Sequence, residues 1–381
     1  MSMVAFMPWC RIDKTYEVGE IQILPFERHE PIDGLDDTAQ CRVSTILASY
    51  KTIVGKPVER AAFVRYGGRL LIDDLNDKEQ ETLHELVTLA CFCGLARREY
   101  YEQGGHYCNS ECFSLYIQKF DEADFVSLRT RRRDGHTLDV WPIADIAITI
   151  PAHCQPVRGV NFDEALLKGL VAHRAQSADK EWARWQNAIS CFNQANTDGE
   201  NVRYQVEWVL LCSAFQHILG AKSNAEDVAK KFAEAVAPSS PVLVGNVEHH
   251  SDLTEADKSI RYEWMKEFYR VRGDFAHGRL QTNQPSVWNP LEHLVLAAIT
   301  FPLLVRCLLN KKGRYEFTDN DLAQIDAFEK LADEQSLKPP LSQKNSLDWV
   351  WPRLVQDAKS EVLGRKALND PEIQRLWSGS S

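Results

Sequence analysis

The change in hydrophobic period near residue 161 constrains the fold of this chain more than any other feature. Before it, apolar residues occur in short, strand-length runs around one strong helical segment. After it, they recur at helical spacing in long segments with no convincing strand. At 381 residues the chain is also too long for one ordinary core. We therefore predict an α+β domain at 1–160, an all-α helical bundle at 161–338 and a helical tail at 339–381.

The first part contains several candidate strands and one well-marked helix. The expected strands are 16–24, 60–66, 107–120, 125–132 and 136–141. Asp134 and Gly135 separate the last two strands, and this dipeptide between alternating runs favours a hairpin. A helix is expected over 77–100, with Asn76 or Asp77 as its N-cap.

The second part is predicted to consist of helices joined by short loops. The expected helices are 161–174, 179–195, 200–220, 224–236, 253–278, 288–311 and 319–335, with one or two more within 347–377. Residues 237–252 are rich in Pro, Ser and Gly and are expected to form an irregular loop.

Composition narrows the class of protein. A hydrophobic content of 44% with 26% charged residues is typical of a globular protein. The net charge of -10 opposes general attraction to nucleic acid, so RNA binding requires a local basic patch. No secretory signal is recognisable, and the longest apolar run, 294–305, is shorter than the ~20 residues that span a bilayer. We expect a cytoplasmic protein without a membrane span, with ten reduced cysteines and no cofactor.

The segment that begins at Ser259 carries the most chemical information. Apolar residues recur there at steps of four, four, three and four, which forms one buried stripe along a helix: Ile260, Trp264, Phe268, Val271 and Phe275. Gly278 is expected to end this helix, because glycine readily adopts the left-handed conformation of a C-cap.

Two polar residues near the end of this helix, Arg272 and His277, are candidate functional residues. On a regular helix Arg272 lies roughly 60° from the centre of the apolar stripe, where it is at least half buried and requires an anionic partner. His277 falls about 140° further round, so the two side chains cannot meet on one atom within a regular helix. Either the helix is deformed near Gly273, or a second subunit completes the site across a two-fold axis; we favour the second subunit with some local deformation.

The stretch 269–278, Tyr-Arg-Val-Arg-Gly-Asp-Phe-Ala-His-Gly, resembles the Arg-x4-6-His motif of the HEPN superfamily, in its Apea-like branch. The helix 203–220 is similar to that branch's second characteristic helix, although Gln216 replaces the usual glutamate. Gly273 also stands where the superfamily often has Asn, Asp or His. The resemblance covers roughly 161–335 and implies a HEPN-like helical bundle that dimerises.

The resemblance also implies a function, metal-independent cleavage of RNA, with tRNA as one candidate substrate. The RNA 2′-hydroxyl would be the nucleophile, His277 would transfer protons and Arg272 would bind phosphate, giving 2′,3′-cyclic phosphate and 5′-hydroxyl ends. Relatives of this kind serve in bacterial antiviral defence or as toxin-like effectors. The N-terminal domain would then have a sensing or regulatory role.

Three alternatives remain open at this stage. In the first, Arg272 bonds a core carboxylate and His277 only caps the helix. In the second, the HEPN-like domain is catalytically inactive and binds RNA or a protein. In the third, the helical domain only dimerises and the N-terminal domain does the work.

Further residues are candidates for supporting roles. Asp274 could orient His277, and Arg270 could contact phosphate, because both share its helix face. Arg129, Arg131 and Arg133 alternate onto one face of the hairpin, where they form either an RNA-contacting ridge or a charged, aggregation-resistant edge.

Two other groups offer weaker signals. The residues Cys91, Cys93, His106, Cys108 and Cys112 have the chemistry of zinc ligands, but their spacing is poor, so no metal site is predicted. Glu248, His249 and His250 precede the motif helix and are interpreted as a polar surface loop.

Overall fold

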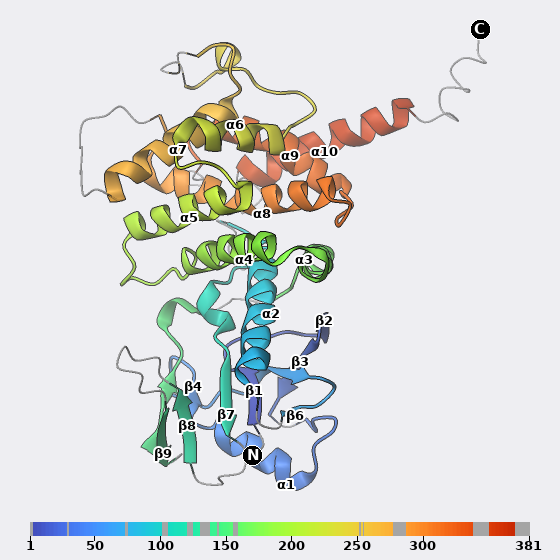
Figure 1. Cartoon of the computed structure of the whole chain (residues 1–381), viewed down its shortest axis with the longest axis vertical. Helices are drawn as coiled ribbons and strands as arrows, with labels where there is room; N and C mark the ends of the chain where they lie inside the picture. The colour runs from blue at the N-terminus through green and yellow to red at the C-terminus, as the bar shows by residue number, and fades with distance from the viewer. Residues whose placement is uncertain are drawn as a thin grey trace, which may run out of the picture. The chain divides into compact units, whose positions relative to one another are not determined.

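A computed structural model describes residues 3–28, 30–72, 75–100, 106–119, 125–129, 138–142, 145–154, 159–250, 253, 255–276, 287–337 and 350–369. The chain divides into two compact units. The first comprises 1–99, 104–171 and 196–200, and the second comprises 100–103, 172–195 and 201–381. The first unit contains the sheets and the second is helical, as the change in period predicts (Figure 1).

The first unit is built on a six-stranded sheet. Its strands follow the order β2-β3-β5-β1-β6, and β7 also pairs with β1. The strands are β1 (Met3–Met7), β2 (Tyr16–Val18), β3 (Ile21–Glu27), β5 (Arg60–Tyr66), β6 (Leu71–Ile72) and β7 (Tyr116–Lys119). All of these pairings are antiparallel, and the central register sets Phe6 opposite Phe63. Rings from three strands therefore meet in one core, since Phe63 also contacts Phe26.

Short strands complete this unit outside the main sheet. β4 (Tyr50–Lys51) pairs in parallel with β10 (Ile148–Thr149), and β8 (Phe125–Arg129) pairs antiparallel with β9 (Leu138–Pro142). The predicted hairpin is therefore confirmed in its strands, while its connecting residues lie outside the described residues.

Several expectations for this unit need correction. The single strand expected over 16–24 is a hairpin, because Gly19 turns the chain with a φ of +60°. In the described part of the expected strand 107–120, only 116–119 is a strand, and Ser110–Phe113 forms the 3-10 helix η1. The neighbouring residues Cys112 and Phe113 are both buried, which breaks the alternation of a strand.

Helices α1 (Asp37–Leu47) and α2 (Asp77–Leu95) belong to the same unit. The sequence reading missed α1, whose residues Val43, Ile46 and Leu47 join the phenylalanine core. α2 begins as predicted at Asn76, whose side chain accepts a hydrogen bond from the backbone of Glu79, and the Glu79 carboxylate bonds back to the cap. It ends earlier than expected, at Leu95.

The predicted helices of the second half are all present. They are α3 (Glu164–Gln176), α4 (Asp179–Gln194), α5 (Tyr204–Leu219), α6 (Ala225–Ala235), α7 (Ile260–Ala276), α8 (Pro290–Lys311) and α9 (Asp319–Ala332), followed by α10 (Val350–Asn369). The first unit extends to Val171, beyond the boundary expected at 160. α10 falls in the predicted tail, yet it packs against α9 and belongs to the helical unit.

Aromatic residues hold α7 against α5, which lies between α4 and α7 (Figure 1). The Trp208 ring of α5 stacks on Phe268 of α7 with centroids 5.0 Å apart, and Trp264 stacks on the same ring at 5.6 Å. The Trp208 indole N–H also donates to the backbone carbonyl of Phe268, at 2.8 Å. These contacts fix both the depth of α7 and its rotation about its own axis.

A buried polar pair connects α7 to the chain that enters α8. Glu267 accepts hydrogen bonds from His293 Nε2 at 3.0 Å and from the backbone N–H groups of Val287 and Trp288. Burial acts to raise the pKa of Glu267, but these donors outweigh it and hold that pKa below its usual value. Burial lowers the pKa of His293, although Glu267 opposes the shift. The pair is therefore a carboxylate that accepts a bond from a neutral imidazole.

We predict that this pair makes the helical unit sensitive to acid. Below the unfolded-state pKa of about 6.5, the unfolded chain protonates His293 more readily than the folded one does, so stability falls by up to ~1.4 kcal/mol per pH unit. Glu267 adds to the loss below its unfolded-state pKa of about 4.3, where the unfolded chain takes up a proton that the folded carboxylate resists. Urea denaturation at pH 7.5 and pH 5.5 should show a smaller pH-dependent loss in His293→Gln than in the wild type. An equal loss would assign the sensitivity to other groups.

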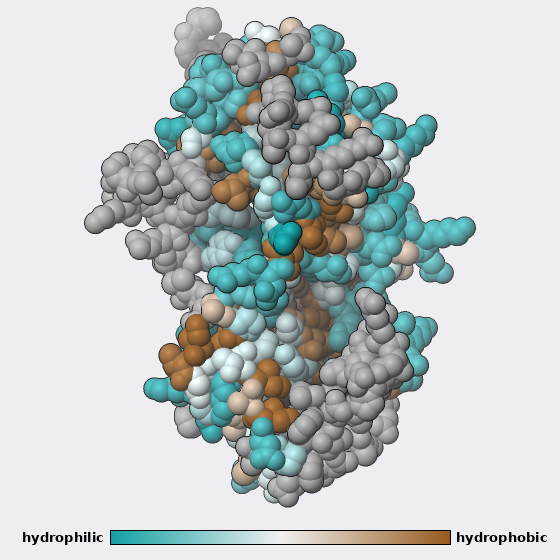
Figure 2. Space-filling model, turned by 90° about the vertical axis from the view of Figure 1, so that its left-hand side faces the viewer, coloured by the Kyte–Doolittle hydropathy of each residue, from teal (hydrophilic) through white to brown (hydrophobic). Residues whose placement is uncertain are grey.

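α8 is long and apolar enough to cross a membrane by composition. However, 72% of its apolar window is buried within the structure, as in the core helix of a soluble protein. On the face that Figure 2 shows, apolar residues form separate patches among hydrophilic ones. These observations favour a core role for α8.

Candidate functional site at the end of helix α7

The predicted apolar stripe of the motif helix is confirmed. Ile260, Trp264 and Phe268 are fully buried, and Val271 and Phe275 are partly buried. α7 runs without interruption through Gly273 to Ala276. The local deformation expected near Gly273 is therefore wrong, because nothing crowds this position and the helical hydrogen bonds continue past it.

Arg272 lies on the last turns of α7 and is more than half buried, as predicted. Its Nη1 donates a hydrogen bond to the Tyr269 hydroxyl at 2.9 Å, and the guanidinium lies 5.2 Å from the centroid of the same ring. The Tyr269 hydroxyl in turn donates to Gln216 Oε1 of α5, at 2.7 Å. A chain of neutral groups thus fixes the arginine relative to α5.

The charge of Arg272 is not balanced within the described residues. The ion pairs of α7 there involve Arg261, Glu263 and Lys266. Arg272 Nε is buried and has no hydrogen-bond partner among the residues that the structure describes. The core carboxylate of the first alternative is therefore not found in the described part of the chain, and a guanidinium held by neutral partners is suited to bind an anion.

Of the other residues expected at this helix end, the structure describes Arg270 and Asp274 but not His277. Arg270 is exposed and Asp274 is partly buried, and neither side chain bonds another described residue. His277 lies outside the described residues. The chain is described again from Val287, whose backbone N–H donates to Glu267.

The hairpin arginines are not brought to this site by any described contact. Arg129 ends β8, where only its backbone is described, and Arg131 and Arg133 lie outside the described residues. Their phosphate-contacting role stays a prediction.

The loop before α7 is attached to the helical core. The backbone N–H groups of Glu248 and His249 donate to the Asp333 carboxylate. The His250 ring packs 5.2 Å from that of Trp288. Glu248 and His249 are exposed, as expected of a surface loop. His250 departs from this expectation, since it is partly buried.

The cysteines are free thiols, and most are buried. Within the described residues Cys91, Cys93, Cys108 and His106 do not join a metal-ligand cluster. Burial raises the pKa values of Cys91 and Cys108, which makes them poor nucleophiles.

Sequence reasoning missed the polar partners that shape the site, namely Glu267, His293 and Ser223, whose hydroxyl lies 3.3 Å from that of Tyr269. A signal was present for Glu267, since it stands beside Phe268 in the apolar stripe of α7. Ser223 lies in the loop after α5, and no pattern points to it.

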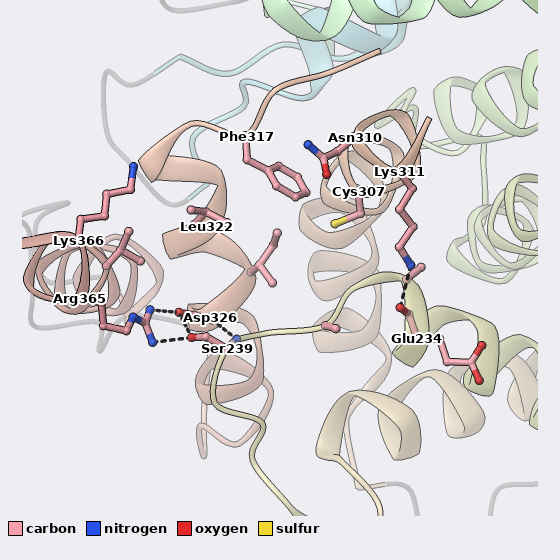
Figure 3. A pocket seen from close by; sticks show the side chains of 14 residues that line it. Glu234, Ser239, Cys307, Asn310, Lys311, Phe317, Leu322, Asp326, Arg365 and Lys366 are labelled. Carbon is pink, nitrogen blue, oxygen red and sulfur yellow. Dashed lines mark hydrogen bonds and ion pairs between the residues drawn. The ribbon is translucent and has the colours of Figure 1, made fainter. Parts of the chain in front are cut away.

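Two cavities of the helical unit lie apart from Arg272. One, of about 430 Å³, has an apolar wall that includes Cys307, Phe317 and Leu322 (Figure 3). Its cations are already engaged, since Arg365 pairs with Asp326 and Lys311 bonds the backbone of Glu234. The other, of about 870 Å³, is lined by four basic residues (Lys222, Lys230, Lys258, Arg261) and four acidic residues (Glu226, Asp227, Glu234, Asp257). Neither has the excess positive charge that a nucleic acid requires.

Comparison of the chain with protein-family models, with curated proteins and with solved structures gives no match. The candidate site therefore stands on its own geometry.

We predict that Gly273→Ala stabilises the protein by about 0.5–1 kcal/mol, because alanine restricts the unfolded chain and favours the helix. No atom lies within 4 Å of the position that the new Cβ would take. Urea denaturation measures the effect, and Gly364→Ala in α10, where the space is equally open, is the matched control. A destabilised Gly273→Ala beside a stabilised control would mean that α7 is strained at this point.

Proposed function

We propose that this protein is a cytoplasmic, metal-independent endoribonuclease whose helical unit is HEPN-like and acts as a homodimer. The observation that carries the proposal is the partly buried Arg272 guanidinium, which has Tyr269 and Gln216 as neutral neighbours and no carboxylate partner among the described residues. A phosphate diester is an anion that such a guanidinium binds through parallel hydrogen bonds.

The packing of α5 against α7 supports the resemblance on which the proposal rests. These are the two helices that resemble the HEPN motifs, and the Gln216–Tyr269–Arg272 chain runs between them. Gln216, where glutamate is usual, leaves the arginine without a countercharge at that position. The two departures from the motif, Gln216 and Gly273, are thus compatible with phosphate binding at Arg272.

In the proposed reaction the RNA 2′-oxygen attacks the adjacent phosphorus and the bond to the 5′-oxygen breaks. One copy of His277 accepts the proton of the 2′-hydroxyl, and the second copy donates a proton to the departing 5′-oxygen. Arg272 stabilises the negative charge on the phosphorane-like transition state. Asp274 orients His277, while Arg270 and the hairpin residues Arg129, Arg131 and Arg133 contact the RNA backbone. Because an unrestrained ribonuclease would harm its host, the N-terminal unit has a sensing or regulatory role, as suits an antiviral or toxin-like effector.

The central test is cleavage of tRNA and total RNA by the purified full-length protein in EDTA. We expect His277→Ala to lower the rate about 10²–10⁴-fold, as for loss of a general acid–base, and Arg272→Ala to lower it about 10²–10³-fold. The ends should be 2′,3′-cyclic phosphates and 5′-hydroxyls, which a polynucleotide kinase can label only at the 5′ side. His249→Ala and Arg314→Ala are matched controls at exposed positions and should retain activity.

Intact RNA with a gel shift that Arg272→Ala abolishes would instead support the second candidate, an inactive HEPN-like binding module. The same uncompensated guanidinium favours that candidate, since phosphate binding does not require His277. A third outcome is activity that survives Arg272→Ala and His277→Ala but is lost in the double variant Arg131→Ala, Arg133→Ala. This result would overturn both candidate functions of the helical unit and assign the activity to the N-terminal unit.

Tyr269 provides a separate test as a positioning residue. Tyr269→Phe keeps the ring beneath the guanidinium but removes the hydroxyl between Arg272 and Gln216. We expect kcat to fall about 10-fold with little change in KM, since a misplaced group weakens the transition state more than RNA binding. A change in KM alone would assign Tyr269 to binding.

A further inference from the structure

Two short 3-10 segments of the N-terminal unit bring three metal-ligating side chains together. η1 carries Glu111, and η3 (Ala152–Cys154) carries His153 and Cys154. Their ligand atoms all lie within 4.8 Å of one another. Glu111 Oε2 lies 2.8 Å from His153 Nε2 and 3.5 Å from Cys154 Sγ. Residues about forty positions apart in the chain thus converge on one point.

The side chain of Asn109 holds this arrangement in place. Its Nδ2 donates to the backbone carbonyl of His153 at 2.6 Å, and its Oδ1 accepts from the thiols of Cys154 and Cys112 at 3.4 and 3.5 Å. The Cys112 thiol also donates to the backbone carbonyl of Cys154, at 3.4 Å. The two segments are therefore joined and the sulfur is oriented by partners that are not themselves the three ligands, as is usual around metal sites.

The exposure of the three side chains leaves a route for an ion. Cys154 is fully buried, whereas the side chains of Glu111 and His153 are 35% and 27% exposed. The sulfur thus forms the inner wall of the cluster, and the carboxylate and imidazole lie towards solvent.

We propose that Glu111, His153 and Cys154 bind a zinc ion that ties η1 to η3. A thiolate, an imidazole and a carboxylate are the ligand types that zinc accepts, and the thiolate disfavours magnesium and calcium. Zinc–sulfur and zinc–nitrogen bonds of about 2.3 and 2.0 Å require ligand atoms roughly 3.5 Å apart in a tetrahedron. The Cys154–Glu111 separation already has this value, and the ion replaces the hydrogen bond between Glu111 and His153. The fourth position of the tetrahedron is left to a water molecule, and the site is independent of the proposed RNA chemistry.

Cobalt binding to the untagged full-length protein tests the proposal. After removal of bound metal with a chelator, titration with Co²⁺ should give a thiolate-to-cobalt charge-transfer band and visible bands of tetrahedral cobalt, saturating at about one ion per chain. Zn²⁺ should displace the cobalt and raise Tm. Cys154→Ser and His153→Gln should each weaken binding by more than the roughly 10–100-fold that loss of a ligand's hydrogen-bonding partner causes.

Cys91→Ser is the matched control, because Cys91 is a buried thiol of the same unit outside the cluster and should leave the cobalt spectrum unchanged. Circular dichroism checks that each variant is folded, and the exposure of His153 makes His153→Gln the variant least expected to unfold the unit. A wild-type protein without a charge-transfer band, or an equal loss of binding in Cys91→Ser and Cys154→Ser, would overturn the proposal.

Discussion

The hydrogen bond from the Trp208 indole to the backbone carbonyl of Phe268 fixes the rotation of α7 about its axis. Rotation is the critical variable for this helix, because Arg272 lies between its buried stripe and its exposed face. With Phe268 stacked under Trp208, the guanidinium is carried to Tyr269 and Gln216 rather than into solvent or into the core. The proposed phosphate site therefore depends on an apolar contact one helical turn away.

Arg272 differs from the other buried charges of α7 in the kind of partner that it has. The other buried charges of α7 have partners, because an unpaired buried charge is costly: Arg261 pairs with Glu329, and the Glu267 carboxylate accepts a hydrogen bond from the neutral His293 ring. Arg272, nearer the surface, has neutral partners instead. This contrast is expected where one cation is kept for a ligand and the others serve the fold. With a net charge of -10 the protein as a whole does not attract polyanions, so the proposed RNA binding depends on local cations such as Arg272.

The two proposals concern different units and different chemistry. A zinc ion on Glu111, His153 and Cys154 would stabilise the sheet-containing unit, in which a sensing or regulatory role is proposed. RNA cleavage would take place in the helical unit, through proton transfer and electrostatic stabilisation alone. Variants of the zinc ligands should therefore change zinc content without changing RNA cleavage, and variants of Arg272 or His277 should do the reverse.

The sequence by itself determined the division into an α+β part and a helical part, the helices from α3 to α10, and the stripe of α7. These follow from local periodicity and capping, as at Asn76, which short segments encode directly. Tertiary structure alone decided the partners of Arg272, the Glu267–His293 pair and the convergence of Glu111 with Cys154. Each joins residues that are distant in sequence or differ in burial, and periodicity carries no information about which distant side chains meet. The same reason explains why α1 and β1 were missed: their residues are recognised as core only once the sheet is assembled.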